Sequence, residues 1–218
     1  VQCDIDILGE ASCLAEIELI LATTTLLGKL NFKDFKVRIN ERRILKAMAA
    51  YSGFTEDQYD QVFIILDKMD KIGWDGVKAE LLEAGYPEKN VETYVSMFGE
   101  MENAKDSLVY LEEKLSGVLE DGVIDNLRMI RESVEATAAA QFRLIFDPTL
   151  VRGMSYYTGT IFEIEMAEFG SSVAGGGRYD KMIGKFTGKA TPACGFSIGF
   201  ERIVTILMEQ GFRIPGAA

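Results

Sequence analysis

The chain has 218 residues, 48% of them hydrophobic, with a formal net charge of −11 and no histidine. This length and apolar content indicate one globular domain, or one domain with an insertion. The lack of histidine excludes catalytic triads and histidine metal sites, and the acidic balance argues against a broad nucleic-acid surface. No apolar run approaches the roughly 20 residues that span a bilayer, so we expect a cytoplasmic protein without a membrane partner.

The cysteines, Cys3, Cys13 and Cys194, are an odd and scattered set without metal-ligand spacing. This pattern predicts reduced thiols rather than a disulfide framework or a zinc site. We therefore predict no protein ligands for a metal ion.

The first eight residues alternate between apolar and polar side chains, which is typical of a half-buried antiparallel strand. Gln2 and Asp6 share the polar face with Asp4, and by the pattern alone a solvated face is the usual interpretation. Apolar side chains at helical spacing then predict a helix from about residue 11 to 29. A short strand follows from Phe35 to Ile39, with Asn40 as the expected N-cap of the next helix.

The stretch from residue 41 to 140 is poor in strand patterns and carries several helical ones, with many acidic positions. We predict a helical subdomain over 45–140, inserted into a core formed by 1–44 and 141–218. Its apolar stripes are typical of core packing, and they comprise Val62, Ile65, Leu66 and Met69, then Leu108, Leu111 and Leu115. Trp74 is expected to pack in the same core.

The sheet pattern resumes at Phe142, Leu144 and Phe146 and leads into a predicted strand from Leu150 to Glu165. Alternation along that strand places Tyr157 and Glu163 on one face and directs Tyr156 toward the core. Arg152 supplies a planar, permanently charged donor just before the two tyrosines. This combination suits a small zwitterionic ligand.

Two further glycine-rich segments follow the tyrosines. The run AGGGRYD contains Gly175, Gly176 and Gly177, where the lack of a Cβ permits close approach of a ligand or, alternatively, marks a β-bulge. In GFSIGFERI, Gly195, Ser197 and Gly199 alternate with apolar residues, so one face of that strand is nearly bare. A helix is predicted from Glu201 to Met208, with Arg202 in its first turn.

Taken in order, VQCDIDILG, LVRGMSYYTGTIFEIE, AGGGRYD and GFSIGFERI resemble the histidyl-tRNA synthetase family. They are similar to the second half of motif 2, the two histidine-specific signatures and motif 3 of these class II enzymes. The resemblance implies an α+β fold: a mainly antiparallel class II synthetase-type sheet flanked by helices. It also implies a helical insertion of the kind that touches the tRNA acceptor arm.

The resemblance assigns roles to residues that the patterns alone leave open. Arg152 would be catalytic, bridging the substrate carboxylate and the α-phosphate, although a structural salt bridge suits it equally. Histidine would be bound by Gln2, Asp6, Tyr156, Tyr157, Glu163, Gly175, Gly176 and Gly177, with Gln2 and Asp6 at its α-amino group. ATP would be bound by Arg202 and Gly199, with Mg²⁺ accompanying the ATP phosphates. Met154-Ser155 departs from the leucine-aspartate of many members, so Ser155 supplies no charge to orient Arg152.

The activity implied is that of a histidine-tRNA ligase, which activates histidine with ATP and transfers it to tRNA(His), as a homodimer in the full-length parent. The alternative is a histidine-sensing regulatory paralogue of ATP phosphoribosyltransferase, which shares this fold. Retention of the ATP arginine, Arg202, favours the enzyme. Because the chain begins inside a strand pattern at Val1, we expect a fragment that is inactive in isolation.

Overall fold

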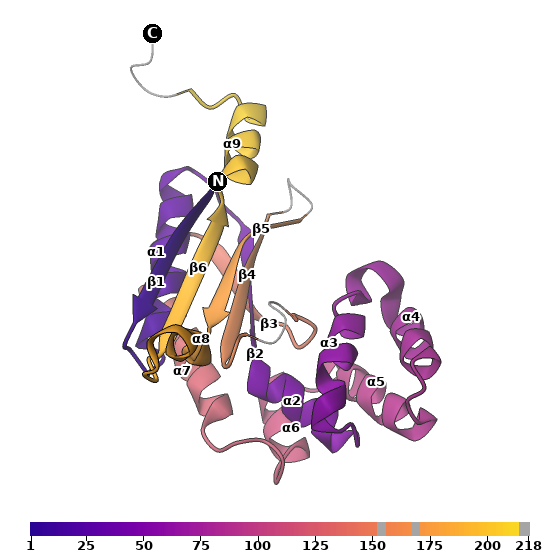
Figure 1. Ribbon diagram of the computed structural model, residues 1–218. Coiled ribbons are helices and arrows are strands. Elements are labelled where there is room, and N and C mark those ends of the chain that lie inside the picture. The colour runs from indigo at the N-terminus through magenta and orange to yellow at the C-terminus, as the bar shows by residue number, and fades with distance from the viewer. Residues whose placement is uncertain (152–155, 167–170, 214–218) are drawn as a thin grey trace.

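The structure is a computed structural model that describes residues 1–151, 156–166 and 171–213. Its centre is a sheet with the strand order β1-β6-β5-β4-β2-β3. The strands are β1 (Gln2–Leu8), β2 (Phe35–Glu41), β3 (Phe142–Phe146), β4 (Thr160–Met166), β5 (Ser171–Arg178) and β6 (Ala193–Gly199). Figure 1 shows the twisted sheet with a group of helices standing away from it at one end.

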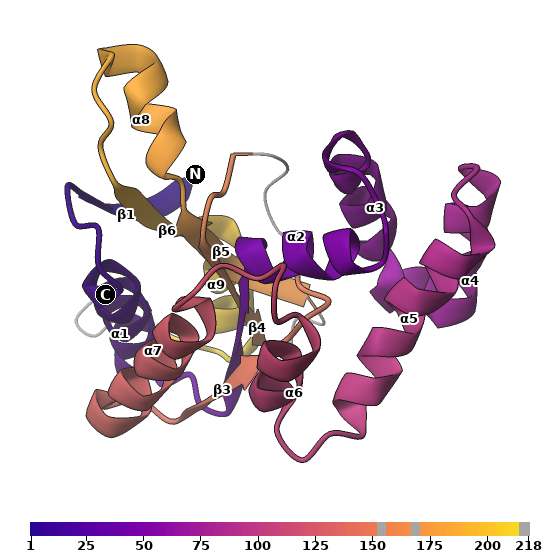
Figure 2. The same cartoon turned by 90° about the horizontal axis from the view of Figure 1, so that it is seen from below.

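Helices lie around the sheet in two groups. α1 (Leu14–Lys29) packs on β6 and on α7 (Val123–Thr137), so these two helices cover one face of the sheet, as Figures 1 and 2 show from two directions. α8 (Asp180–Thr187) and α9 (Phe200–Glu209) flank β6. The remaining helical segments pack mainly on one another, and they are α2 (Arg42–Tyr51), the 3-10 helix η1 (Glu56–Gln58), α3 (Tyr59–Leu66), α4 (Met69–Glu83), α5 (Glu88–Glu102) and α6 (Ser107–Lys114).

The two sheet faces differ in character because side chains alternate along each strand. The helix-covered face is apolar apart from a buried polar network around Arg178, and Phe162 of β4 stacks on Phe196 of β6 with ring centroids 4.6 Å apart. The other face carries Gln2, Asp4 and Asp6 on β1, which pair in register with Gly199, Ser197 and Gly195 on β6. The second face is therefore polar and, over β6, nearly free of side chains.

The helical patterns predicted between residues 41 and 140 are confirmed. The leucines and Val62 of both predicted stripes are buried, and Trp74 packs against Phe98 with ring centroids 4.6 Å apart. The thiols of Cys13 and Cys194 are buried and free, and burial raises the pKa of each. Within the described ranges, no helix has the length and apolar character needed to cross a membrane.

The sheet is mixed, which qualifies the expected antiparallel arrangement. β2 and β3 pair in parallel, while the other neighbouring strands pair antiparallel. Parallel neighbours require a long crossover, and the helices from α2 to α7 provide it between β2 and β3. The helical stretch between β2 and β3 thus supplies the crossover that this parallel pair requires.

Two local predictions are wrong. Among the described residues of the strand predicted from Leu150 to Glu165, the strand begins only at Thr160, because Thr158 bonds to the end of β5 and the start of α8 instead. Asn40 is not an N-cap but a strand residue, whose amide donates to Leu150 O at 3.0 Å. The cap of α2 is Glu41, which accepts from the Arg43 backbone N–H.

Candidate active site

A cavity of about 260 Å³ opens on the polar face of the sheet. Its size is close to the lower end of the usual range for small-molecule sites. Its floor is made by the glycine-rich middle of β5 and β6, and its walls by β1, the segment before β4, and α8. The residues that line it are Gln2, Asp4, Asp6, Tyr156, Tyr157, Gly175, Gly176, Tyr179, Met182, Gly195, Phe196 and Ser197.

Most of the predicted histidine-binding residues meet in this cavity. Gln2 and Asp6 come from β1, Gly175 and Gly176 from β5, and the tyrosine pair from the chain before β4. The cavity thus brings together β1 and segments that follow it by about 150 residues or more in the sequence. Sequence reasoning missed Tyr179 and Met182 as lining residues and set Asp4 aside, whereas it had placed Ser197 on the nearly bare face of its strand.

The two tyrosines differ from the prediction in their burial. Tyr157 is 8% exposed and Tyr156 is 40% exposed, which is the reverse of what strand alternation predicts. The cause is that neither lies in a strand, so period-2 alternation does not apply to them. Their ring centroids are 4.2 Å apart, and both rings border the cavity.

Glu163 does not line this cavity. It lies on the same sheet face, opposite Gly175 in register, and its carboxylate is 3.4 Å from Nη1 of Arg38. Arg38 also donates to Asp147 at 2.7 Å, so Glu163 belongs to a polar cluster nearer the edge of the sheet. Its predicted contact with histidine stays a prediction.

The glycine run serves strand packing as well as the cavity. A Cβ on Gly176 would lie 1.9 Å from Gly195 O, and one on Gly177 would lie 2.6 Å from Thr160 O. Gly177 is not among the lining residues. The irregularity in β4–β5 pairing falls between Ile164 and Glu165, so the proposed β-bulge lies beside the glycines rather than within them.

Asp6 is held in place by Tyr179 and by the absence of a side chain at Gly195. The Tyr179 hydroxyl donates to Asp6 Oδ1. A Cβ on Gly195 would lie 2.0 Å from that same oxygen. Burial, reinforced by the Asp6 carboxylate, raises the pKa of Tyr179, which keeps its hydroxyl a donor.

The charge of the cavity is negative. Asp4 and Asp6 are the charged residues among its described lining, and no lysine or arginine stands beside them there. Carboxylates at a cavity attract a cationic group, and tyrosine rings with hydroxyls suit a flat polar ring. The site can therefore bind a small molecule with an ammonium group and an aromatic or heteroaromatic ring.

The predicted ATP residues lie at one end of this site. Gly199, the register partner of Gln2, is the N-cap of α9, and Arg202 in the first turn of α9 donates to Ser172 O. Arg152, Met154 and Ser155 lie outside the described residues. The predicted role of Arg152 is therefore untested.

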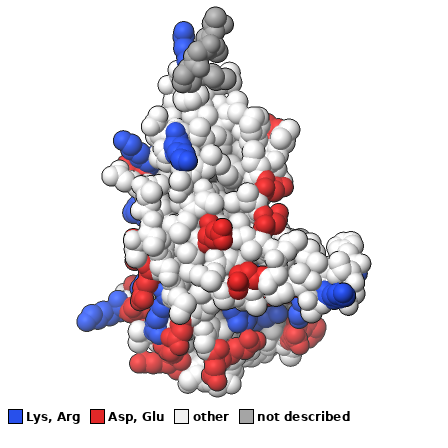
Figure 3. Space-filling model, turned by 90° about the vertical axis from the view of Figure 1, so that its left-hand side faces the viewer, with Lys and Arg blue, Asp and Glu red and all other residues white. Residues whose placement is uncertain are grey.

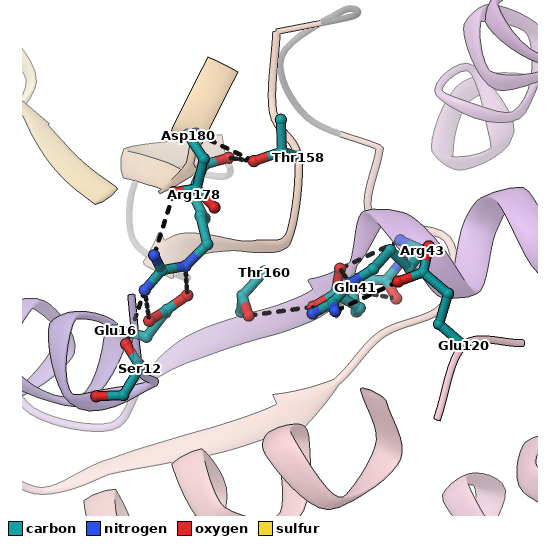
Figure 4. A network of polar contacts seen from close by, with 10 residues as sticks. Ser12, Glu16, Glu41, Arg43, Glu120, Thr158, Thr160, Arg178 and Asp180 are labelled. Carbon is teal, nitrogen blue, oxygen red and sulfur yellow. Dashed lines mark hydrogen bonds and ion pairs between the residues drawn. The ribbon is translucent and has the colours of Figure 1, made fainter. Parts of the chain in front are cut away.

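A second, larger cavity of about 550 Å³ lies on the other side of β5, among α1, α2 and α8. Figure 4 shows its polar network, in which Arg178 donates to both Glu16 oxygens at 2.6 Å and Arg43 bonds to Glu41 at 2.9 Å. Burial alone would lower the pKa of Arg178, but its bonds to Glu16 raise that pKa. These charges satisfy one another, so we assign this network to structure.

The outer surface gives no sign of a broad basic face on the side drawn in Figure 3. Acidic and basic side chains are interspersed over the lower part of that view, and the upper part carries few charges. A phosphate backbone requires clustered cations. This side of the molecule therefore lacks the charge pattern expected of an extended nucleic-acid surface.

Comparison with known proteins identifies relatives across nearly the whole chain. A family model described as histidyl-tRNA synthetase matches residues 1–203. A histidine–tRNA ligase of Leifsonia xyli subsp. xyli is 47% identical over 95% of this chain and 49% of its own length. A probable histidine–tRNA ligase of Tropheryma whipplei (strain Twist) is 40% identical over 96% of this chain and 50% of its own. The chain thus spans about half the length of these curated relatives.

A solved structure with a similar fold belongs to the same family as these sequence relatives. The crystal structure of histidyl-tRNA synthetase from Nostoc sp. PCC 7120 matches with a TM-score of 0.80 and 26% identity, covering 98% of this chain and 51% of that one. Fold and sequence thus agree over the sheet and over the helices between β2 and β3 alike. The chain belongs to the histidyl-tRNA synthetase family.

Proposed function

We propose that this chain carries the amino-acid site of a histidine–tRNA ligase, which activates histidine with ATP to histidyl-adenylate and transfers it to tRNA(His). The observation that carries the proposal is the cavity over Gly175, Gly176 and Gly195, whose charged lining side chains are carboxylates. In a member of this family, such a cavity suits the ammonium and ring of histidine. A cytoplasmic location and a homodimer of the full-length protein belong to the same proposal.

The activation step needs groups that neutralise charge as pyrophosphate leaves. We propose Arg152 for the substrate carboxylate and the α-phosphate, and Arg202 for ATP, because an arginine fork matches both groups in shape. We expect Mg²⁺ to enter on the ATP phosphates and to shield their charge. No covalent nucleophile is required, since the carboxylate of histidine itself attacks the α-phosphorus.

The histidine-sensing alternative shares the amino-acid cavity and differs in what it does with ATP. The relatives at 47% and 40% identity bear the name of the ligase. Arg202, which a sensor would not need, is present at the end of the cavity. Both observations favour the ligase.

Two measurements test the proposed function: amino-acid binding to this chain, and ATP–pyrophosphate exchange by the full-length protein. Calorimetric titration of this chain should detect histidine and not phenylalanine or glutamine, because the two competitors lack an imidazole. Histidine-dependent ATP–pyrophosphate exchange is expected from the full-length protein. A chain that binds all three amino acids equally, or a full-length protein without exchange, would refute the proposal.

Gly195→Ala tests whether Asp6 contributes to the site. The added Cβ would displace the Asp6 carboxylate from Tyr179 without meeting backbone within 3.2 Å, so we expect a stability loss of about 1 kcal/mol, the low end for overpacking. Histidine affinity should fall about tenfold, because a charge-assisted contact is lost. Calorimetry and urea unfolding measure the two effects. Unchanged histidine affinity would remove Asp6 from the binding site.

A further inference from the structure

Two tyrosines that border the amino-acid cavity each have a chain neighbour that lies on the other side of β5. Tyr157 and Tyr179 line the cavity over the glycines, whereas Thr158 and Arg178 line the larger cavity among α1, α2 and α8. Figure 4 shows Thr158 and Asp180 bonded to each other, with Arg178 close by. Contacts in the larger cavity therefore act on the chain directly beside each tyrosine ring.

Thr158 joins the tyrosine segment to the end of β5 and to the start of α8. Its backbone N–H donates to Arg178 O at 2.8 Å, and its hydroxyl accepts from the Asp180 N–H at 3.1 Å. The first N–H groups of a helix have no partner within the helix, so this hydroxyl satisfies one of them at the start of α8. The residue after Tyr157 is thus bonded to the two residues that flank Tyr179.

The partners of Thr158 are themselves held in place. Arg178 donates to both carboxylate oxygens of Glu16 in α1 at 2.6 Å, and to Asp180 at 3.2 Å. The Asp180 carboxylate also accepts from the Ala193 N–H at the start of β6, at 2.9 Å. The elements α1, β5, β6 and α8 are thus linked by hydrogen bonds, and Thr158 attaches the tyrosine segment to them.

Gly159 allows this attachment to be close. A Cβ on Gly159 would lie 3.1 Å from Cδ and 3.3 Å from Cβ of Arg178, so the arginine side chain packs directly on the Gly159 backbone. Gly159 O also accepts from the backbone N–H of Arg42 at the start of α2, at 3.0 Å. The chain that leaves Tyr157 is therefore held at two successive residues before β4 begins.

We propose that Thr158 is a positioning residue, whose hydroxyl fixes the separation of the Tyr157 and Tyr179 rings and so the width of the cavity that they line. The inference rests on the function proposed above and deepens it, since Thr158 lines the other cavity and acts through the two tyrosines. Tyr179 also donates to Asp6, so a change in its position would move a carboxylate of the cavity with it. The network that stabilises the fold thereby acts on the site from the far side of β5.

The first measurement is the histidine affinity of three variants of this chain, by calorimetry. Thr158→Val keeps the branched shape and removes the hydroxyl, while Thr158→Ser keeps the hydroxyl. Thr160→Val is the matched control, because its hydroxyl bonds to Glu41 at 3.4 Å and it does not line the amino-acid cavity. Urea unfolding shows that each variant folds.

The loss of one neutral hydrogen bond sets the size of the expected effect. Thr158→Val should weaken histidine binding roughly 3- to 10-fold. Thr158→Ser and Thr160→Val should stay within about twofold of the wild-type affinity. Rescue by serine would show that the hydroxyl, and not the packing of the side chain, is responsible.

The second measurement observes the tyrosine rings without any ligand. The chain is labelled with fluorotyrosine, and the fluorine resonances of the two rings are assigned with Tyr157→Phe and Tyr179→Phe. Both resonances should shift in Thr158→Val, because the rings are no longer held at one separation, and neither should shift in Thr160→Val. Tyr94, which is buried in α5, serves as the internal reference.

The outcomes separate this inference from the proposed function. If Thr158→Val binds histidine as the wild type does, or if Thr158→Ser or Thr160→Val loses as much affinity as Thr158→Val, the inference is overturned and the proposed function stands. Unshifted Tyr157 and Tyr179 resonances in Thr158→Val also overturn it. If the wild-type chain binds no histidine, the proposed function fails, and the fluorine resonances still decide whether Thr158 positions the rings.

Discussion

Arg178→Ala is expected to lower the free energy of unfolding by about 3–5 kcal/mol, the usual loss when one partner of a buried ion pair is removed. Arg178 is 7% exposed and Glu16 is 1% exposed, and the pair is bidentate at 2.6 Å. The same guanidinium donates to Glu10 O at 3.0 Å and Ser12 O at 2.8 Å. The substitution would leave a buried carboxylate and two carbonyls without their donor.

The matched control is Arg128→Ala, since Arg128 is also paired with a glutamate, Glu112, at 2.8 Å. That pair is exposed on the surface, where the loss should be about 0.2–1 kcal/mol. Arg178→Lys should fall between the two, because lysine keeps the charge and lacks the planar fork. Urea unfolding of the three variants gives the ranking. A loss for Arg178→Ala no larger than for Arg128→Ala would show that the network does not stabilise the fold.

Gly176→Ala is expected to cost about 3 kcal/mol or more, at the upper end of overpacking substitutions. Gly176 lies in the middle of the sheet, paired with Phe162 on one side and Phe196 on the other. A Cβ there would lie 1.9 Å from Gly195 O and 2.8 Å from Phe196 Cα. These are backbone atoms of β6, so the clash is relieved only if β5 and β6 move apart.

Gly99→Ala provides the same chemical change without the clash. Gly99 lies inside α5, and a Cβ there meets nothing within 4 Å. Alanine is favoured over glycine in a helix by about 0.5–1 kcal/mol, so this variant should be more stable than wild type. Thermal unfolding of both variants decides the matter. If Gly176→Ala unfolds at the wild-type temperature, the close packing of β5 on β6 is not as tight as these distances imply.

Gly176→Ala and Gly195→Ala together separate the roles of the two glycine-rich segments. Gly176→Ala acts on the sheet itself, whereas Gly195→Ala first meets the end of the Asp6 side chain. If Gly176→Ala lowers stability and Gly195→Ala lowers histidine affinity, then the first glycine is required for packing of β5 on β6, and the second for the position of the Asp6 side chain. Both properties come from residues that look equivalent in the sequence.

Several features could be predicted from local patterns because their physical cause is local. Alternation along β1 and β6 identified the polar and bare sheet faces, although β1 is exposed on both faces and not half-buried as predicted. Helical spacing identified the buried apolar stripes between residues 41 and 140. The ordered motifs were sufficient to place the chain in its family, which the comparisons confirm. In each case, the prediction depends only on residues that are close to one another in the sequence.

The burial of the tyrosine pair could not be predicted in the same way. Alternation assumes a strand, and Tyr156 and Tyr157 lie before β4, where Thr158 bonds to the end of β5 rather than continuing the ladder. The same holds for Asn40, whose side chain reaches Leu150 O instead of capping a helix. A partner that is 110 residues away leaves no trace in a local pattern.

The sequence by itself thus determined the fold class, the helical character of residues 41–140 and the set of segments that line the cavity, because periodicity and motif order depend on near neighbours. The tertiary structure alone decided that β2 and β3 run parallel, that Tyr179 holds Asp6, and that Asp4 stands beside the buried hydroxyl of Ser197. These relations depend on strand order and register between distant segments. Register is fixed only when the strands pair and the apolar side chains of each strand are buried on one face of the sheet.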